Sequence, residues 1–406
     1  MKLKTSNFAP AMSICFLVIA GIVNLAFAGP VSYYGEFQTK NYMFVGSKTG
    51  SAVQVRGLSL FWSQWGNSFY NANAVNHLAS DWKIEVIRAA YGSTGAVYDS
   101  ETAAQNRAFV NTIIQAAIDN DIYVIVDWHS HNAQKETENS TAFFSDIART
   151  WGQYDNVIFE LYNEPTNVEW SGIKSYAETV IDTIRKYSDN LILVGTPNYD
   201  QYIGDVIGNA IDKENIGYVL HFYAASHPLD SYKNAILSVL GANLPLFVTE
   251  YGTTNADGGC SPVITESCTQ DHYTSHSENS SNNWHFFLDS KKISSVAWSV
   301  FDKYEGSAFF GTSPDESFDQ SNPANWADTN QMTLSGKYIF KKLNVYAESA
   351  VWRNPSSILN NSALNADLTG SYETYSLQGK KGKTGAGVYI LKYKNGKKLL
   401  RAVPNP

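Results

Sequence analysis

The feature that most constrains the fold is a regular alternation between short apolar segments and longer amphipathic segments, which begins near Ser51. Between the apolar segments lie helix-like stretches such as 102–120 and 175–188. Eight alternations predict an α/β protein of the (β/α)₈ TIM-barrel type rather than an open sheet. A doubly wound sheet fits the periodicity too, but no glycine-rich nucleotide-binding loop follows any strand. The segments typical of buried strands are 52–60, 83–91, 122–129, 157–164, 191–196, 216–223, 244–252 and 293–302.

The two ends of the chain differ from this pattern. Residues 1–28 have a basic start, an apolar stretch and a small-residue cleavage site, which together predict a signal peptide. We assign residues 29–352 to the barrel, with its last helix at 336–352. Residues 353–406 are turn-rich and then basic with alternating apolar positions, which predicts a linker and a small β-rich appendage. A second interpretation is that this tail is recognised by a cell-surface or export machinery.

Composition limits the cellular setting and the partners. The net charge of −8 argues against a nucleic-acid partner, because phosphate binding needs a basic face. After the signal, no segment is apolar for long enough to form a transmembrane span, so we expect an exported, extracellular protein. Two cysteines, Cys260 and Cys268, remain in the mature chain, and in an oxidising compartment we expect them to form a disulfide.

Chemically distinctive residues occur at the C-terminal ends of successive predicted strands. In a parallel barrel these ends converge on one face, which is where barrel proteins place their active sites. We therefore expect one shared site from Arg88, Asp127, His129, Asn163, Glu164, His221, Tyr223, Glu250 and Trp298.

Two glutamates stand out within this set. Residues 157–165 read VIFELYNEP, and we expect Pro165 to end the strand and hold Glu164 rigidly at its tip. Glu250 follows the seventh strand, nearly opposite the fourth around an eight-fold ring. Two carboxyl groups that face each other across a cleft suit acid–base and nucleophilic chemistry on an acetal.

The neighbouring residues fit supporting roles. Arg88 would keep Glu250 ionised if it reaches it, Tyr223 can donate a hydrogen bond to the nucleophile, and Asn163 can bind a sugar 2-hydroxyl. Two histidines could orient the sugar or the acid, and several tryptophans offer flat faces for a pyranose ring: His129, His221, Trp62, Trp65 and Trp298.

Several of these segments also carry a family resemblance. VRGLSLFWSQW, VIRAAY, VIVDWH, LYNEP, LHFYAASH, FVTEYGT and AWSVFDKYEGS resemble glycoside hydrolase family five, in its branch of bacterial-type endo-β-1,4-glucanases, from about Ser51 to Tyr338. The resemblance implies a TIM barrel, a β-glucan polysaccharide as substrate, and a retaining double displacement with no cofactor and no metal. It makes Glu164 the acid/base and Glu250 the nucleophile, with Lys303 and Glu305 as sugar contacts. Many relatives have a histidine where this chain has Phe61.

Three other functions remain open. The same retaining chemistry could act on mannan, xyloglucan or mixed-linkage glucan, because the fold does not fix the polymer. A metal-dependent barrel hydrolase could use Asp127, His129 and His131, which alternate at a strand end. A non-catalytic glycan-binding protein could be built on the same barrel.

Overall fold

The computed structural model describes residues 29–93, 100–256, 277–303, 305–311 and 318–353, together with three strands between 372 and 403. The predicted signal peptide at 1–28 and both Cys260 and Cys268 lie outside the described residues. Contacts divide the chain into two units, one of which, Phe27–Asn354, contains the barrel. In the other unit, β11 (Tyr372–Ser376), β12 (Gly387–Tyr393) and β13 (Lys398–Val403) form an antiparallel sheet.

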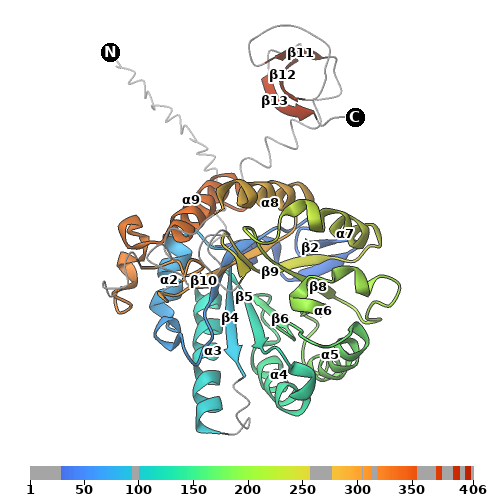
Figure 1. The fold of residues 1–406 in the computed structure, drawn as a ribbon, viewed down its shortest axis with the longest axis vertical. Coiled ribbons are helices and arrows are strands. Elements are labelled where there is room, and N and C mark those ends of the chain that lie inside the picture. Colours follow the sequence, from blue (N-terminus) through green and yellow to red (C-terminus); the bar gives the residue numbers. More distant parts are fainter. Residues whose placement is uncertain are drawn as a thin grey trace, which may run out of the picture. The chain divides into compact units, whose positions relative to one another are not determined.

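Eight parallel strands close into a barrel in the order β10-β3-β4-β5-β6-β7-β8-β9 (Figure 1). The expected TIM barrel is therefore confirmed, although most strands are shorter than the apolar segments that predicted them. Their bounds are β3 (Arg56–Leu60), β4 (Val86–Gly92), β5 (Tyr123–His129), β6 (Val157–Glu160), β7 (Ile192–Val194), β8 (Ile216–Tyr223), β9 (Leu246–Gly252) and β10 (Ser295–Val300).

Helices alternate with these strands and cover the outside of the barrel (Figure 1). Three of the described helices begin with an N-cap, since Asn71, Ser100 and Thr333 accept hydrogen bonds from backbone N–H groups of the first turn. None of the described helices is both long and apolar enough to cross a membrane. The helices are α1 (Pro30–Tyr34), α2 (Ala72–Ser80), α3 (Glu101–Asp119), α4 (Thr137–Trp151), α5 (Trp170–Ile184), α6 (Pro197–Asp200), α7 (Leu229–Gly241), α8 (Glu278–Lys291) and α9 (Leu334–Ser349).

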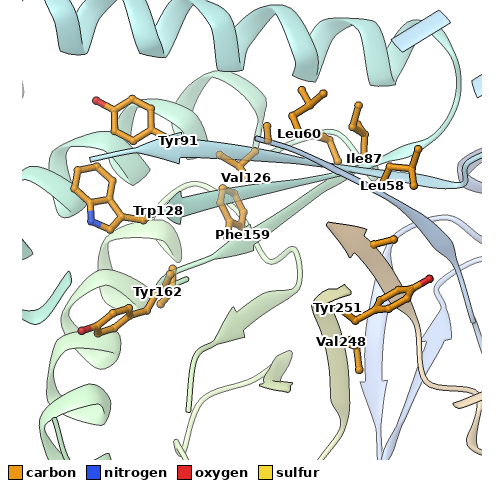
Figure 2. Packing of buried hydrophobic residues seen from close by; sticks show 14 of the residues in the cluster. Leu58, Leu60, Ile87, Tyr91, Val126, Trp128, Phe159, Tyr162, Val248 and Tyr251 are labelled. Atoms are coloured by element: carbon orange, nitrogen blue, oxygen red, sulfur yellow. The ribbon is translucent and has the colours of Figure 1, made fainter. Parts of the chain in front are cut away.

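The period-two alternation of strand side chains separates two apolar clusters. On β5, Val126 and Trp128 belong to the larger cluster, which also contains the buried faces of the helices. Figure 2 shows such outward-facing side chains on neighbouring strands. Tyr123 and Ile125, which alternate with them, belong to a second cluster inside the barrel. The same alternation places the next two members of the inward row, Asp127 and His129, closer to the C-terminal mouth.

An N-terminal hairpin packs against the interior cluster. Strands β1 (Phe37–Lys40) and β2 (Met43–Gly46) pair antiparallel. Phe37 meets the ring of Tyr123 edge-on at 4.7 Å, and Phe44 lies 5.9 Å from Phe247. Each buried phenylalanine contributes about 2–3 kcal/mol through removal of apolar surface from water. The hairpin thus seals the N-terminal end of the barrel and leaves the opposite end free for a site.

The predicted end of the fourth strand is wrong. We expected the fourth strand to continue to residue 164 and to end at Pro165, but β6 ends at Glu160. Beyond it the backbone is held by separate hydrogen bonds: Asn163 N–H donates to Trp128 O over 3.2 Å, and Glu164 N–H donates to Ser130 O over 3.3 Å. Regular pairing stops early because β7, its neighbour, has only three residues, so Glu164 lies on an anchored loop rather than on a strand tip.

Candidate active site

A cavity of about 510 Å³ lies at the C-terminal ends of the barrel strands. Every sequence-predicted site residue lines it except Arg88 and Asp127, which are fully buried, and the two cysteines outside the described residues. The predicted residues in its lining are Trp62, Trp65, His129, Asn163, Glu164, His221, Tyr223, Glu250, Trp298, Lys303 and Glu305.

The two predicted glutamates face each other in this cavity. A carboxyl oxygen of Glu164 and one of Glu250 lie within 4.8 Å of each other and of a ring nitrogen of His221. The Glu164 side chain is 14% exposed and that of Glu250 is 6% exposed. A reacting atom between them could therefore contact both carboxyl groups while only Glu164 keeps appreciable access to water.

Arg88 organises the floor of the site. Its guanidinium lies 3.0 Å from Glu250 Oε2 and 2.9 Å from Asp127 Oδ2, and it binds both oxygens of Glu160, at 2.7 and 3.1 Å. It also donates to Asn163 Oδ1 over 2.6 Å. One guanidinium faces three carboxyl groups, so full ionisation of all three would leave two uncompensated negative charges in a buried space. The arrangement therefore favours retention of protons in this cluster.

Glu250 experiences opposing influences on its charge. Burial raises its pKa, and the neighbouring Glu164 adds to the rise, while His221, Arg88 and Tyr223 oppose it. Tyr223 donates its phenolic hydrogen to Glu250 Oε1 over 2.7 Å. Burial raises the pKa of Tyr223 well above its ordinary value, which keeps this hydroxyl a donor. Glu250 is thus a buried carboxylate with two fixed donors.

A β-bulge aims two consecutive residues of β9 into the barrel. The register of β9 against β8 shifts between the pairs Val219–Phe247 and His221–Glu250. As a result Thr249 donates to Glu160 Oε1 over 2.7 Å while the adjacent Glu250 contacts Arg88. Strict alternation would place one of the two outside, so the bulge is what allows both to reach the site.

Histidines surround the other glutamate. His221 Nδ1 lies 3.1 Å from Glu164 Oε1, and His131 Nε2 lies 3.5 Å from Glu164 Oε2. Burial lowers the pKa of His221 to about 4, so its ring is neutral near pH 7. Glu164 therefore lies beside a neutral imidazole on its buried side.

Aromatic rings form one wall of the cavity. Trp298 stacks on His129 with ring centroids 5.3 Å apart, and Trp62 meets His129 edge-on at 4.2 Å. Trp65 is 62% exposed, which leaves its face free to receive a ligand. Phe61 stacks on Phe301 at 4.3 Å and also lines the cavity. These rings present flat apolar surface beside the two carboxyl groups.

A polar pair lies at the edge of the cavity. Lys303 Nζ is 2.6 Å from Glu305 Oε2, and Ser307 donates to Glu305 Oε1 over 2.8 Å. Lys303 is half-exposed and Glu305 is nearly buried. Both can offer hydrogen bonds to a polar ligand in the cavity.

The residues that a metal-dependent hydrolase would use do not form a ligand set. His129 Nδ1 forms a hydrogen bond with Asp127 Oδ2 at 2.5 Å, and the same oxygen also contacts Arg88. This nitrogen and this oxygen therefore already have partners within the protein. Among the described residues, the group close enough to hold a metal is instead Glu164, His221 and Glu250. Its atoms already form hydrogen bonds with Tyr223, Arg88 and Thr249.

Sequence reasoning missed three buried polar residues of this site. Glu160 had a detectable signal, because it alternates with Ile158 and is charged within an apolar strand. Thr249 had none, since the bulge that turns it inward depends on pairing with β8. Asp200, fully buried in the turn after β7, also had none.

Comparison with known proteins agrees with this geometry. Residues 47–304 match the family described as Cellulase (glycosyl hydrolase family 5), and the chain belongs to this family. It is 38% identical to endoglucanase Z of Dickeya dadantii over 304 residues, which is 74% of this chain but only 64% of that relative.

Solved structures give the same result. A structure from Cytophaga hutchinsonii is 38% identical with a TM-score of 0.70, over 79% of this chain and 97% of that one. The catalytic domain of Thermobifida fusca endoglucanase Cel5A, solved as a variant in complex with cellotetraose, is 28% identical with a TM-score of 0.69, over 78% of this chain and 99% of that one.

Proposed function

We propose that this chain is a secreted endo-β-1,4-glucanase that hydrolyses internal bonds of cellulose or related β-glucans with retention of configuration. The separation of Glu164 and Glu250 carries the proposal: carboxyl oxygens within 4.8 Å suit a retaining enzyme, in which the two groups are about 5 Å apart. An inverting enzyme needs a gap of roughly 6.5–9.5 Å to admit water.

The surroundings support distinct roles for the two glutamates. Glu250, bound by Arg88 and Tyr223, is the nucleophile: its carboxylate attacks the anomeric carbon as the bond to the leaving oxygen breaks. Glu164, the more exposed of the two, is the acid that gives that oxygen a proton. Glu164 then takes a proton from water, whose oxygen attacks the same carbon and releases Glu250.

The remaining residues are proposed to bind and orient the sugar. Asn163 is fixed by Arg88 and can bind the 2-hydroxyl, where hydrogen bonds strengthen in the transition state. His129, fixed by Asp127, and Trp298 form a stacked wall for a pyranose ring. Trp65, Lys303 and Glu305 would bind sugar units farther along the chain.

Substrate and location rest on the relatives and the sequence. Several relatives are named endoglucanases, and the T. fusca domain binds cellotetraose, which favours β-1,4-glucan over mannan, xyloglucan or mixed-linkage glucan. The predicted signal peptide at 1–28 supports secretion, and the basic tail at 353–406 remains a proposed β-rich appendage or sorting segment. A disulfide between Cys260 and Cys268 remains a prediction.

Three measurements test the proposal. Reducing-sugar release is expected to be greatest on carboxymethyl cellulose in a panel with mannan, xyloglucan and mixed-linkage glucan, and absent from Glu250→Gln. No release from any of these would favour the glycan-binding alternative.

Proton NMR of the first products should show the β-anomer, and initial formation of the α-anomer would refute retention. Full activity after dialysis against a chelator is expected, whereas a loss restored by zinc would favour the metal-dependent alternative.

A further inference from the structure

A third carboxyl group lies beside the acid–base residue. Asp200 is fully buried, and its Oδ2 lies 3.4 Å from His221 Nδ1, the nitrogen that faces Glu164. Its Oδ1 accepts from Thr196 N–H over 2.6 Å, but Oδ2 has no hydrogen-bond partner among the described residues. A buried carboxyl oxygen without a partner is costly, so its orientation toward the site needs an explanation.

The backbone holds Asp200 in this place at a conformational cost. Asn198, Tyr199 and Asp200 have φ angles of 57°, 56° and 60°, in the left-handed region that non-glycine residues seldom adopt. Tyr199 N–H also donates to Pro165 O over 3.1 Å, which ties this turn to the loop that carries Glu164. The two carboxyl groups are therefore held as one unit.

The site's hydrogen bonds define which nitrogen of His221 carries its proton. Thr249 donates its hydroxyl hydrogen to Glu160 Oε1, an oxygen that also accepts from Arg88. The oxygen of Thr249 must then accept from His221 Nε2, 2.8 Å away. A neutral His221 protonated at Nε2 has a lone pair at Nδ1. That lone pair faces both Glu164 and Asp200, and an acceptor facing two acceptors is unstable unless a proton lies between them.

We propose that Asp200 is a positioning residue for catalysis, whose carboxyl group shares one proton with Glu164 around the Nδ1 of His221. This rests on the proposed acid/base role of Glu164. The pair gives this proton to the leaving oxygen in the first step and regains one from water in the second. Before the first step, the negative charge on the partner carboxyl group opposes loss of the proton and keeps Glu164 protonated to higher pH.

The local charges are consistent with a retained proton. Burial raises the pKa of Asp200 well above its ordinary value, and the nearby Glu164 raises it further, while the Thr196 amide and Arg88 oppose the rise. The other charged or titratable groups that face the pair are Glu160, Glu250, His131 and Tyr162.

The test compares Asp200→Asn with Asp205→Asn in the full chain. The first variant removes the partner carboxyl group but keeps the side chain's size, and the second removes an exposed carboxyl group outside the cavity. In the profile of kcat/KM against pH, the alkaline limb reports the essential acid. We expect Asp200→Asn to move this limb to lower pH by about 0.5 unit or more, because the ionised partner no longer opposes loss of the proton from Glu164. An unmoved limb, or an equal movement in Asp205→Asn, would overturn the proposal.

A second measurement does not depend on activity. Nitrogen-15 NMR of the wild-type histidine rings, with His221→Gln used to assign the signal, is expected to show Nε2 protonated and Nδ1 unprotonated near pH 7. A proton on Nδ1 would overturn the proposal, because that nitrogen could then donate to both carboxylates. If the chain cleaves no β-glucan, the proposed function fails while this measurement still decides the arrangement around His221.

Discussion

The guanidinium of Arg88 lies 3.0 Å from the carboxylate of Glu250, although 162 residues separate them in the chain. Both side chains are directed into the barrel, one from β4 and the other from the bulged end of β9. Arg88 also fixes Asn163 and Glu160, so one cation connects the proposed nucleophile with a proposed sugar-binding residue and the buried network around His221.

Replacement of the cation should destabilise the fold. Arg88→Met would leave Asp127, Glu160 and Glu250 without their shared partner, at an expected cost of about 3–5 kcal/mol in the free energy of unfolding. Urea unfolding measures this loss. Since the cost comes from buried carboxylates, the deficit should shrink as the pH falls from about 7 toward 4 and they become protonated. A deficit that is equal at both pH values would indicate lost packing rather than lost charge.

Removal of the phenolic donor should impair the nucleophile. Tyr223→Phe deletes the hydrogen bond to Glu250, worth about 1.5–3 kcal/mol for a charged acceptor, so kcat/KM should fall roughly 10- to 100-fold. Tyr223 lowers the pKa of Glu250, so its loss should raise that pKa and move the acidic limb of the pH profile to higher pH. Tyr338→Phe, which removes a hydroxyl bound to Asn282 instead, is the matched control. A lower activity with an unmoved acidic limb would contradict this account of Tyr223.

Loss of the nucleophile should be rescued chemically. Glu250→Ala is expected to lower kcat by about 10⁴-fold or more, because the covalent step has no attacking group. Azide added to this variant should restore part of the turnover of an activated aryl cellobioside and yield an α-glycosyl azide, since azide attacks the anomeric carbon once. Near-wild-type activity without azide would exclude Glu250 as the nucleophile.

Loss of the acid should depend on the leaving group. Glu164→Ala is expected to slow cleavage of unactivated cellooligosaccharides by roughly 10²–10⁴-fold. The first, bond-breaking step on a dinitrophenyl cellobioside should be nearly unaffected, because this leaving group needs little protonation. Pre-steady-state release of dinitrophenol measures that step. Equal losses on both substrates would argue that Glu164 only binds sugar.

Several elements of the fold and site could be predicted from local patterns. The apolar runs around Val124 and Val219 identified barrel strands, because a strand buried on both faces needs apolar residues at nearly every position. Arg88, His129, His221 and Tyr223 were located at strand ends, since period-two alternation fixes their direction once the strand is known. The end of β6 was predicted wrongly, because it depends on the short neighbour β7 rather than on Pro165.

The sequence by itself determined the alternation of strands and helices and identified the two glutamates with their polar neighbours. It could do so because buried residues recur at fixed, short intervals along a strand or a helix. Only the tertiary structure decided how Thr249 and Glu250 both enter the barrel and how Asp200 comes to lie 3.4 Å from His221. A bulge depends on register with another strand, and a loop's approach depends on packing between distant segments. Neither the bulge nor the approach of the loop produces a periodic pattern of residues in the sequence. The buried proton network could therefore be recognised only in the tertiary structure.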